Sequence, residues 1–520
     1  MTPSQRQLTR NAGIVMAAFV LSNLTGLVRQ ILIANQFGTG LEIDAFYAAQ
    51  TLPEILFSLA AGGALASAFV PTFTELLNRP DPQAAWRLAS STVTLVALVL
   101  AAASALAALG APWLIGLLAP GLARTPGQAD LAAELLRILL LSPMLFGISG
   151  LIMGMLNAHG RFLAAALAPT FYWLGMILGL VFLTPIFGIR GLAWGAVLGA
   201  ALHLGVQLPA FLQLRPALRP RAEIRDPLVR QVVGLMGPRL VGVGAVQLNT
   251  IVSTNLASAL VTGSLTALKQ AWQIFTMPQV VLAQALGIAI LPTFSAQAAK
   301  NDLDGLRRSL NEALRLLFVL ALPATAGLLA LGGLVVKVLF EYGRFDAGST
   351  ALVTGALVAY TLGLVSHSVL ELVVRGFYAL KDTWTPVWVG ALAMGLNVIL
   401  SIAFALLFQS LGAAGLALAN TVATTIEVAV LAWLLRGRLG GLALRSLASV
   451  TVRVGLAALL MGFGLVVWLM LMQAQSSWLT LAGGIGLGGI VYWGLIWVLG
   501  VPEARQIPEL IFRRLRRRAV

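Results

Sequence analysis

The chain has 520 residues, of which 59% are hydrophobic and only 10% are charged. This composition excludes an ordinary soluble protein, because about a quarter of the residues in globular domains are charged. The net charge of +15 would suit a nucleic-acid-binding protein. We exclude nucleic acid as a partner, because most arginines and lysines fall on one side of the predicted membrane spans, as the positive-inside rule requires.

Apolar segments long enough to cross a hydrocarbon core recur along the whole sequence. They predict an all-α polytopic membrane protein with about fourteen transmembrane helices of roughly 20 residues or more. The basic loops place both termini in the cytoplasm. The predicted spans are 12–36, 44–75, 88–118, 131–158, 162–187, 190–213, 231–260, 264–295, 310–340, 349–377, 384–409, 411–436, 450–473 and 477–499.

Short motifs occur twice along the chain. AFVPTF (Ala68–Phe73) matches AILPTF (Ala289–Phe294), and GLAWGAVLGA (Gly191–Ala200) matches GLALANTVAT (Gly415–Thr424). An even number of spans separates the members of each pair, which predicts two parallel six-helix lobes around a central cavity. The predicted domains are an N-terminal lobe (1–213), a basic cytoplasmic loop (214–230), a C-terminal lobe (231–436), two extra helices (450–499) and a basic amphipathic tail (500–520).

Helix-bending residues recur in the first two helices of each predicted lobe. Proline removes a backbone hydrogen bond and kinks a helix, and small residues permit close packing or bending. Single prolines and glycines are common in transmembrane helices, but their recurrence in both lobes favours a role in gating. The candidates are Pro53, Gly62, Gly63, Pro71, Pro278 and Pro292.

Arg29 lies deep in the otherwise apolar first span. A lone guanidinium at membrane depth costs at least roughly 2.5–3.5 kcal/mol, so such residues usually face a protein-lined, watery cavity. The alternative is an arginine near the helix end that extends to the headgroups. As a cavity residue, Arg29 would bind an anion, and phosphate is the natural partner of a forked guanidinium.

Other polar residues also fall within spans. Lys269, with Gln273 one turn later, would supply a second cation, although a lysine at a helix start is equally often interfacial. Glu54 and Glu371 are carboxylates that either pair with a cation or carry a proton, and Arg375 is the nearby partner for Glu371. No metal-ligand spacing, catalytic set or cysteine occurs, so we predict no enzyme activity, no metal site and no cofactor.

The sequence resembles the MurJ/MviN lipid II flippases of the multidrug/oligosaccharidyl-lipid/polysaccharide exporter superfamily. The resemblance covers nearly the whole chain and rests on GLVRQILIANQFG (Gly26–Gly38), the segment Ile43–Phe73, NAHGRFLAAALAP (Asn157–Pro169), EYGRFDAGST (Glu341–Thr350) and FYALKDTWTP (Phe377–Pro386). It implies a 14-helix fold with a cationic cavity, and a groove for the lipid tail at the last two helices. It also implies alternating access that moves the lipid-linked peptidoglycan precursor, lipid II, to the outer leaflet of the bacterial inner membrane.

Several cavity positions depart from the family pattern. Arg29 and Asp44 match, but Asn23 stands where the family has arginine, and Gln30 stands where it has aspartate. Phe57 and Ser58 replace a basic pair, Gly62 replaces an acid, and Gln273 replaces an arginine for which Lys269 is a substitute. The resemblance therefore implies a substrate site of Arg29, Asn23, Gln30, Asp44, Lys269 and Gln273 that is less charged than usual.

Partners and driving force follow from the same resemblance. Some family members have a sodium site with a carboxylate, where this chain has Asn397 and Ser401, so membrane potential or protons are the expected driving force. Lipid II, anionic membrane lipids and wall-synthesis enzymes are the expected partners. The alternatives are a flippase for another polyprenyl-pyrophosphate-linked saccharide, a cation-coupled exporter, or a non-transporting scaffold for wall-synthesis enzymes.

Overall fold

The computed structural model describes residues 3–60, 64–79 and 83–504. Every regular element in these ranges is a helix, which confirms the predicted all-α class. The chain divides into two compact units, Met1–Leu265 and Thr266–Val520, and each is considered by itself below. The predicted basic tail beyond Ala504 lies outside the described residues, as do Gly62 and Gly63.

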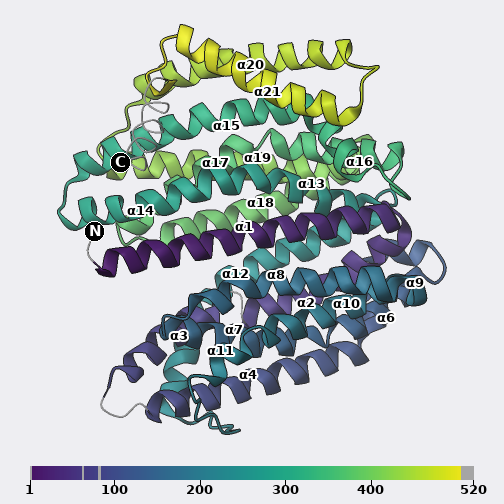
Figure 1. The fold of residues 1–520 in the computed structure, drawn as a ribbon, viewed down its shortest axis with the longest axis vertical. Helices are drawn as coiled ribbons and strands as arrows, with labels where there is room; N and C mark the ends of the chain where they lie inside the picture. Colours follow the sequence, from purple (N-terminus) through teal and green to yellow (C-terminus); the bar gives the residue numbers. More distant parts are fainter. Residues whose placement is uncertain (1–2, 61–63, 80–82, 505–520) are drawn as a thin grey trace. The chain divides into compact units, whose positions relative to one another are not determined.

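The first unit contains the elements from α1 to α12 (Figure 1). Their bounds are α1 Pro3–Phe37, α2 Leu41–Ala60, α3 Ala64–Leu77, α4 Gln83–Leu109, α5 Ala111–Leu118, η1 Pro120–Arg124, α6 Gln128–Leu139, α7 Ser142–Ala158, α8 Phe162–Leu178, η2 Gly179–Leu183, α9 Thr184–Phe187, α10 Ile189–Gly205, α11 Leu208–Leu212 and α12 Pro227–Ala259. The element η1 is a 3₁₀ turn, and η2 is a π-helical turn that continues α8.

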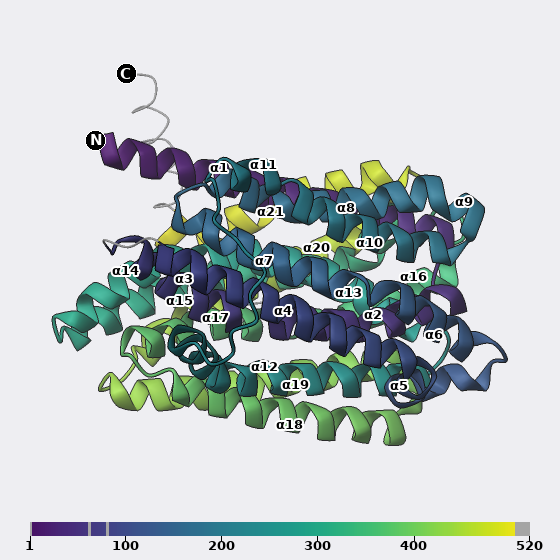
Figure 2. The ribbon, with the colours of Figure 1, turned by 90° about the horizontal axis from the view of Figure 1, so that it is seen from below.

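The second unit contains nearly all of α13 and the elements that follow it, with α18 and α19 side by side (Figure 2). Their bounds are α13 Ser264–Gln279, η3 Val280–Gln284, α14 Ala285–Ala299, α15 Leu303–Phe340, α16 Ala347–Thr361, α17 Leu364–Ala379, α18 Trp384–Leu407, η4 Gln409–Leu411, α19 Ala413–Arg438, α20 Leu444–Leu471 and α21 Ser477–Val498. The π-helical turn η3 begins two residues after Pro278.

Within the described residues, eleven helical segments are long and apolar enough to cross a membrane, and the bent pair α16–α17 raises the number to twelve. The two remaining predicted spans correspond to α2–α3, which is interrupted by the undescribed residues 61–63, and to α12. The predicted number of about fourteen is therefore compatible with the structure but not confirmed by it. The assignment to two six-helix lobes stays a prediction.

The duplicated PTF motif contributes to the hydrophobic core of both units. Phe73 of α3 is fully buried among residues of α4, α7 and α11, and Phe294 of α14 is fully buried among residues of α15, α17 and α19. Burying a phenylalanine side chain contributes about 1.5–3 kcal/mol. The same residue of the motif thus anchors a proline-containing helix in each unit.

Glycines bring α8 and α10 into close contact. A Cβ atom on Gly175 or Gly179 would overlap the backbone of Gly199 or Gly195, so only glycine permits this separation of the helices. Trp173 lies two residues from Gly175, which is about 200° around the helix. The glycine contact therefore fixes α8 so that Trp173 lies on the side opposite α10, where α8 packs against α1.

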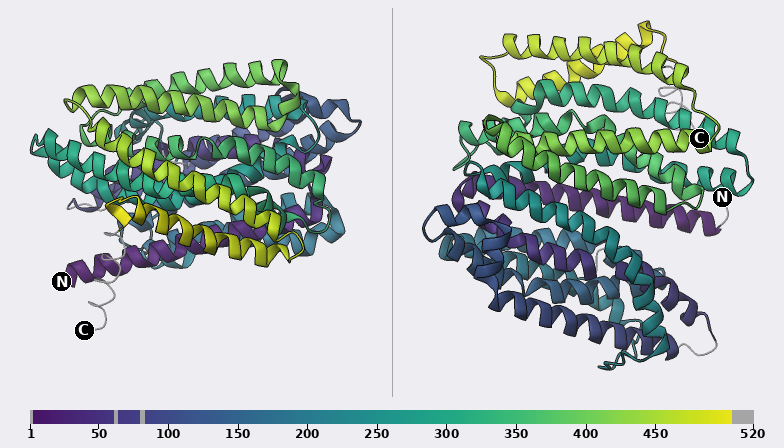
Figure 3. Two further views of the ribbon diagram at one scale, coloured as in Figure 1. Left: turned by 90° about the horizontal axis from the view of Figure 1, so that it is seen from above. Right: turned by 180° about the vertical axis from the view of Figure 1, so that it is seen from behind.

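The last two helices, α20 and α21, pack on α15 (the yellow pair in Figure 3). Pro323 lies inside α15 and has no N–H for the carbonyl of Val319, four residues earlier. The hydroxyl of Tyr492 in α21 donates to that carbonyl at 2.5 Å. A side chain of α21 thereby satisfies the backbone group that proline leaves open in α15.

Candidate functional site around Arg29

Arg29 is buried in the seam between α1 and α8, with 9% of its surface exposed. It lies eight residues before the end of α1 at Phe37, which corresponds to about 12 Å along the helix. Its partners are side chains of α1 and α8. The structure therefore does not support the alternative in which Arg29 extends along the helix to the headgroups.

Three side chains surround the Arg29 guanidinium, and none of them is charged. Its Cζ lies 4.2 Å from the ring centroid of Trp173. Nη1 donates to Sδ of Met176 at 3.8 Å, and Nη2 donates to Oε1 of Gln30 at 2.9 Å. We call Gln30, Trp173 and Met176 the neutral cage. Nε of Arg29 is buried without a hydrogen-bond partner among the described residues.

The neutral cage is fixed by contacts behind it. Gln30 donates its amide N–H to the Tyr47 hydroxyl of α2 at 2.9 Å, which turns its amide oxygen toward Arg29. A Cβ on Gly26 would lie 3.4 Å from Nε1 of Trp173, so the indole lies close against α1 at that position. Met176 is fully buried. The guanidinium is thus held in one orientation.

The other predicted site residues of the first unit have local roles in this structure. Asn23 is exposed and donates to the Phe19 carbonyl one turn earlier at 2.9 Å. Asp44 is buried in the first turn of α2 and accepts a 2.6 Å hydrogen bond from the backbone N–H of Gly263. Gly263 has φ +90°, a conformation that favours glycine. Substrate contacts by Asn23 and Asp44 stay predictions.

Further bonds tie the end of α12 to the rest of the first unit. Asn255 donates to the Leu117 carbonyl at 2.7 Å, and Arg124 donates to the Ala259 carbonyl at 2.6 Å. The backbone N–H of Gly121 donates to the Ser258 hydroxyl at 3.2 Å. Together with the Asp44–Gly263 bond, these contacts hold the C-terminal end of α12 and the following turn against α2, α5 and η1.

In the second unit, Lys269 and Gln273 are both half-buried and lie one turn apart on α13. A common ligand for these residues and Arg29 stays a prediction. The predicted kink residues are inside helices: Pro53 in α2, Pro71 in α3, Pro278 in α13 and Pro292 in α14. Their gating role, and that of Gly62 and Gly63, stays a prediction.

The two predicted carboxylates differ in their partners. Glu371 forms an ion pair with Arg375, one turn later on α17, and accepts a 2.5 Å hydrogen bond from its guanidinium. The Arg375 guanidinium lies against Gly287 of α14, where any side chain would overlap it. Glu54 of α2 is exposed, and the Arg29 guanidinium contacts Gln30, Trp173 and Met176. A Glu54–Arg29 pair in another conformation stays a prediction.

Two of the loop motifs that carry the family resemblance act as helix caps. Asp346 accepts from the Ser349 N–H at 2.8 Å at the start of α16. Asp382, before α18, accepts from the Thr385 hydroxyl at 2.6 Å and pairs with Arg438 at 2.5 Å. The Thr385 bonds, followed by the Arg438 charge, lower the pKa of Asp382 below its ordinary value of 3.8. These two aspartates thus position the starts of α16 and α18.

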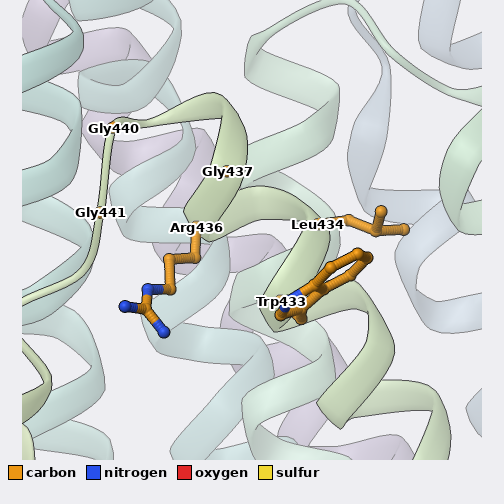
Figure 4. A pocket seen from close by; sticks show the side chains of 6 residues that line it. All are labelled: Trp433, Leu434, Arg436, Gly437, Gly440 and Gly441. Carbon is orange, nitrogen blue, oxygen red and sulfur yellow. The ribbon is translucent and has the colours of Figure 1, made fainter.

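A separate pocket of about 420 Å³ lies at the end of α19 (Figure 4). Trp433 and Arg436 of the last turns line it, as do Gly440 and Gly441 of the following turn. None of the predicted site residues lines this pocket. We therefore do not regard it as the predicted site.

Sequence reasoning missed Trp173, Met176 and Tyr47, which form or support the neutral cage. Their positions have no regular spacing from Arg29, since Met176 is 147 residues away. One signal was present for Trp173. Tryptophans in membrane proteins concentrate at the two interfaces, whereas Trp173 lies near the middle of the 162–187 span, where its N–H and ring need a partner.

Known proteins are similar to this chain over most of its length. The family model described as "Lipid II flippase MurJ" matches residues 33–483. The lipid II flippase MurJ of Burkholderia cenocepacia is 32% identical over 502 residues, which cover 93% of this chain and 96% of the relative. The probable lipid II flippase MurJ of Vibrio cholerae is 32% identical over 522 residues, which cover 95% of this chain and 97% of the relative.

Solved structures give a similar result. A lipid II flippase MurJ in an inward closed conformation matches with a TM-score of 0.80 and 25% identity, covering 93% of this chain and 98% of that one. An inward-facing multidrug resistance MATE family transporter of the MOP superfamily matches with a TM-score of 0.68 and 15% identity, covering 82% of this chain and 98% of that one. The second likeness shows a common fold alone.

Proposed function

This chain belongs to the lipid II flippase MurJ family, and we propose that it moves lipid II by binding the pyrophosphate at Arg29. It is a multi-pass membrane protein of a transporter family, and lipid II is its substrate. The proposal concerns how the substrate is held, in which direction it moves, and what drives the movement.

The observation that carries the proposal is the neutral cage of Arg29. A cation inside a membrane protein is normally paired with a carboxylate or exposed to a water-filled cavity. Arg29 is buried and bonds only to neutral groups among the described residues. These partners bring no negative charge to the guanidinium, and a pyrophosphate would supply it through charge-assisted hydrogen bonds.

Other parts of the chain would complete the site. Lys269 and Gln273 are the proposed second contacts with the headgroup. The outward surfaces of α20 and α21 expose large apolar side chains, including Leu459, Phe463 and Ile490, which suit contact with a polyprenyl tail in the lipid. A ligand shifts a conformational equilibrium only through different contacts in the two states, so pyrophosphate binding would favour the state in which both cations reach it.

Orientation and driving force are part of the same proposal. The basic residues of the predicted inner loops, such as Arg215, Arg219 and Arg225, support an inner-membrane location with cytoplasmic termini. Transport would then run from the inner to the outer leaflet. These arginines would also attract anionic lipids, and wall-synthesis enzymes would be partners on either side.

Membrane potential or a proton gradient is the proposed driving force. Flux of labelled lipid II in proteoliposomes would be measured with a potassium-diffusion potential and with a pH gradient, each applied alone. Acceleration by either one supports gradient-driven transport. Equal flux with and without both gradients contradicts it.

Complementation tests the function itself. The gene would be expressed in a bacterium depleted of its own lipid II flippase, together with Arg29→Ala and Arg137→Ala variants. Arg137 is a matched control, because it lies in a spanning helix of the same unit but is exposed and bonds to the Ala108 carbonyl. We expect rescue by the wild type and by Arg137→Ala, and no rescue by Arg29→Ala at equal expression. Rescue by Arg29→Ala would contradict the proposed site.

A further inference from the structure

Trp173 makes the aromatic contact of the neutral cage. Its ring faces the Arg29 guanidinium at 4.2 Å, within the range of about 6 Å at which an aromatic face attracts a cation. The indole carries no net charge. It can therefore hold the guanidinium in place without neutralising it, which a carboxylate at the same position could not do.

Three features show that Trp173 is fixed for this contact. Gly26, one turn before Arg29 on α1, allows the indole to approach that helix. The glycine seam between α8 and α10 fixes the helix that carries Trp173. The ring of the neighbouring Tyr172 contacts the indole, with the ring centroids 4.6 Å apart. The indole is thus part of a rigid surface rather than a mobile side chain.

We propose that Trp173 is a positioning residue for lipid II transport: its ring orients Arg29 toward the pyrophosphate and preserves the full positive charge. This inference rests on the proposed function of Arg29 and adds a residue to it. Gln30, whose orientation Tyr47 fixes, acts in the same way from the other side. Because binding improves when the protein groups are already oriented, loss of the ring weakens substrate affinity more than it slows the maximal rate.

The experiment compares four proteins in proteoliposomes with labelled lipid II: wild type, Trp173→Leu, Trp173→Phe and Trp113→Leu. Leucine removes the aromatic face, whereas phenylalanine keeps a weaker one. Trp113 of α5 is the matched control, since it is a tryptophan of the same unit that is largely exposed. The half-saturating lipid II concentration and the maximal flux per folded molecule are measured separately.

We expect Trp173→Leu to raise the half-saturating concentration about tenfold with little change in maximal flux. Trp173→Phe should recover part of this loss, and Trp113→Leu should behave as wild type. A purely structural role would lower the folded fraction and leave half-saturation unchanged, which would overturn the inference. So would equal effects of leucine and phenylalanine.

The Arg29→Ala protein separates this inference from the proposed function. If wild type transports lipid II and Arg29→Ala does not, the function of Arg29 stands whatever Trp173→Leu does. If Arg29→Ala transports normally, the proposed role of Arg29 is contradicted, whatever the result for Trp173→Leu. Binding of lipid II to detergent-solubilised Trp173→Leu, with circular dichroism to verify folding, gives the affinity without the transport step.

Discussion

Each unit of this protein has an arginine within a spanning segment, buried for Arg29 and half-buried for Arg375, and the two arginines have opposite kinds of partner. Arg29 in the first unit is held by an indole, a thioether and an amide. Arg375 in the second unit forms an ion pair with Glu371, and its guanidinium packs against Gly287. Of these two arginines, only Arg375 has a carboxylate partner among the described residues.

This difference separates a binding group from a packing group. A buried ion pair is nearly neutral as a unit, and removing one member leaves an uncompensated charge. Arg375 therefore stabilises the packing of α17 and α14 without offering charge to a ligand. Arg29 contributes little to packing stability, because its burial without a counter-charge is unfavourable. Its charge is available to an anion.

The largest effects are expected when each of the two arginines is replaced by alanine. Arg29→Ala should abolish lipid II flux and leave the free energy of unfolding nearly unchanged, because removal of a lone buried cation offsets the lost cation–π contact. Arg375→Ala should lower that free energy by roughly 2–3 kcal/mol, somewhat less than for a fully buried pair, with flux per folded molecule retained. Unfolding in detergent and flux in proteoliposomes give the two quantities.

A double variant provides the control for Arg375. Glu371→Ala combined with Arg375→Ala removes the uncompensated carboxylate as well, so part of the lost stability should return. If the double variant is no more stable than Arg375→Ala, the ion pair is not the source of the effect. If Arg375→Ala abolishes flux in folded protein, the distinction between the two arginines is wrong.

The Gln30→Glu substitution would give Arg29 a carboxylate partner, as Arg375 has in Glu371. A carboxylate in place of the Gln30 amide oxygen, now 2.9 Å from Arg29, would neutralise the guanidinium. We expect the affinity for lipid II to fall about tenfold, since a charge-assisted hydrogen bond contributes about 1.5–3 kcal/mol. The readout is the half-saturating concentration in the flux assay.

The family pattern supplies the matched variant for Gln30→Glu. Relative to that pattern, this chain lacks both an arginine at Asn23 and an acid at Gln30, so the net charge of the first helix is unchanged. Asn23→Arg combined with Gln30→Glu should therefore recover part of the affinity. Unchanged affinity in Gln30→Glu alone would show that the charge of Arg29 does not need neutral partners.

Gly287→Ala would disturb the packing of Arg375 without altering any charge. The new methyl group would overlap the guanidinium, and overpacking of this kind typically costs about 1–3 kcal/mol. Alanine favours a helix over glycine by up to about 1 kcal/mol, so we expect a net loss near 1 kcal/mol in unfolding free energy. Gly395→Ala in α18 is the control, because that position has open space and should be stabilised. Equal stabilisation of both variants would contradict the contact.

The sequence predicts local partners well and distant ones poorly. Arg375 follows Glu371 by four residues, and side chains at that spacing meet on one face of a helix, so the pair could be anticipated. The importance of Arg29 could be anticipated too, because the membrane makes a lone cation costly. Trp173 could not be paired with Arg29, since their contact depends on how α1 packs against α8 through Gly26 and the α8–α10 glycine seam.

The helical spans also include features that the sequence predicts well and features that it predicts poorly. Long apolar segments are a strong signal because their length alone identifies them, and twelve of the predicted segments coincide with helices or helix pairs that are long and apolar enough to span a membrane. The local roles of Asp346 and Asp382 as helix caps were missed, although an aspartate three residues before a helical N–H donor is a recognisable capping pattern.

Arg438 combines both kinds of partner and gives the smallest predicted effect. It lies over the Phe377 ring, 5.4 Å from its centroid, and pairs with Asp382 at the start of α18. Because the folded-state pKa of Asp382 is lowered, its contribution to stability is present above the unfolded-state value near 4 and is lost as the pH falls below it. The stability difference between wild type and Asp382→Asn should therefore be constant from pH 7 to pH 5 and shrink toward pH 3. A difference that is the same at pH 7 and pH 3, measured by thermal unfolding in detergent, would mean that the Asp382 charge contributes nothing. In that case the Phe377 ring and the Thr385 hydroxyl would hold Arg438, a set of neutral partners like that of Arg29.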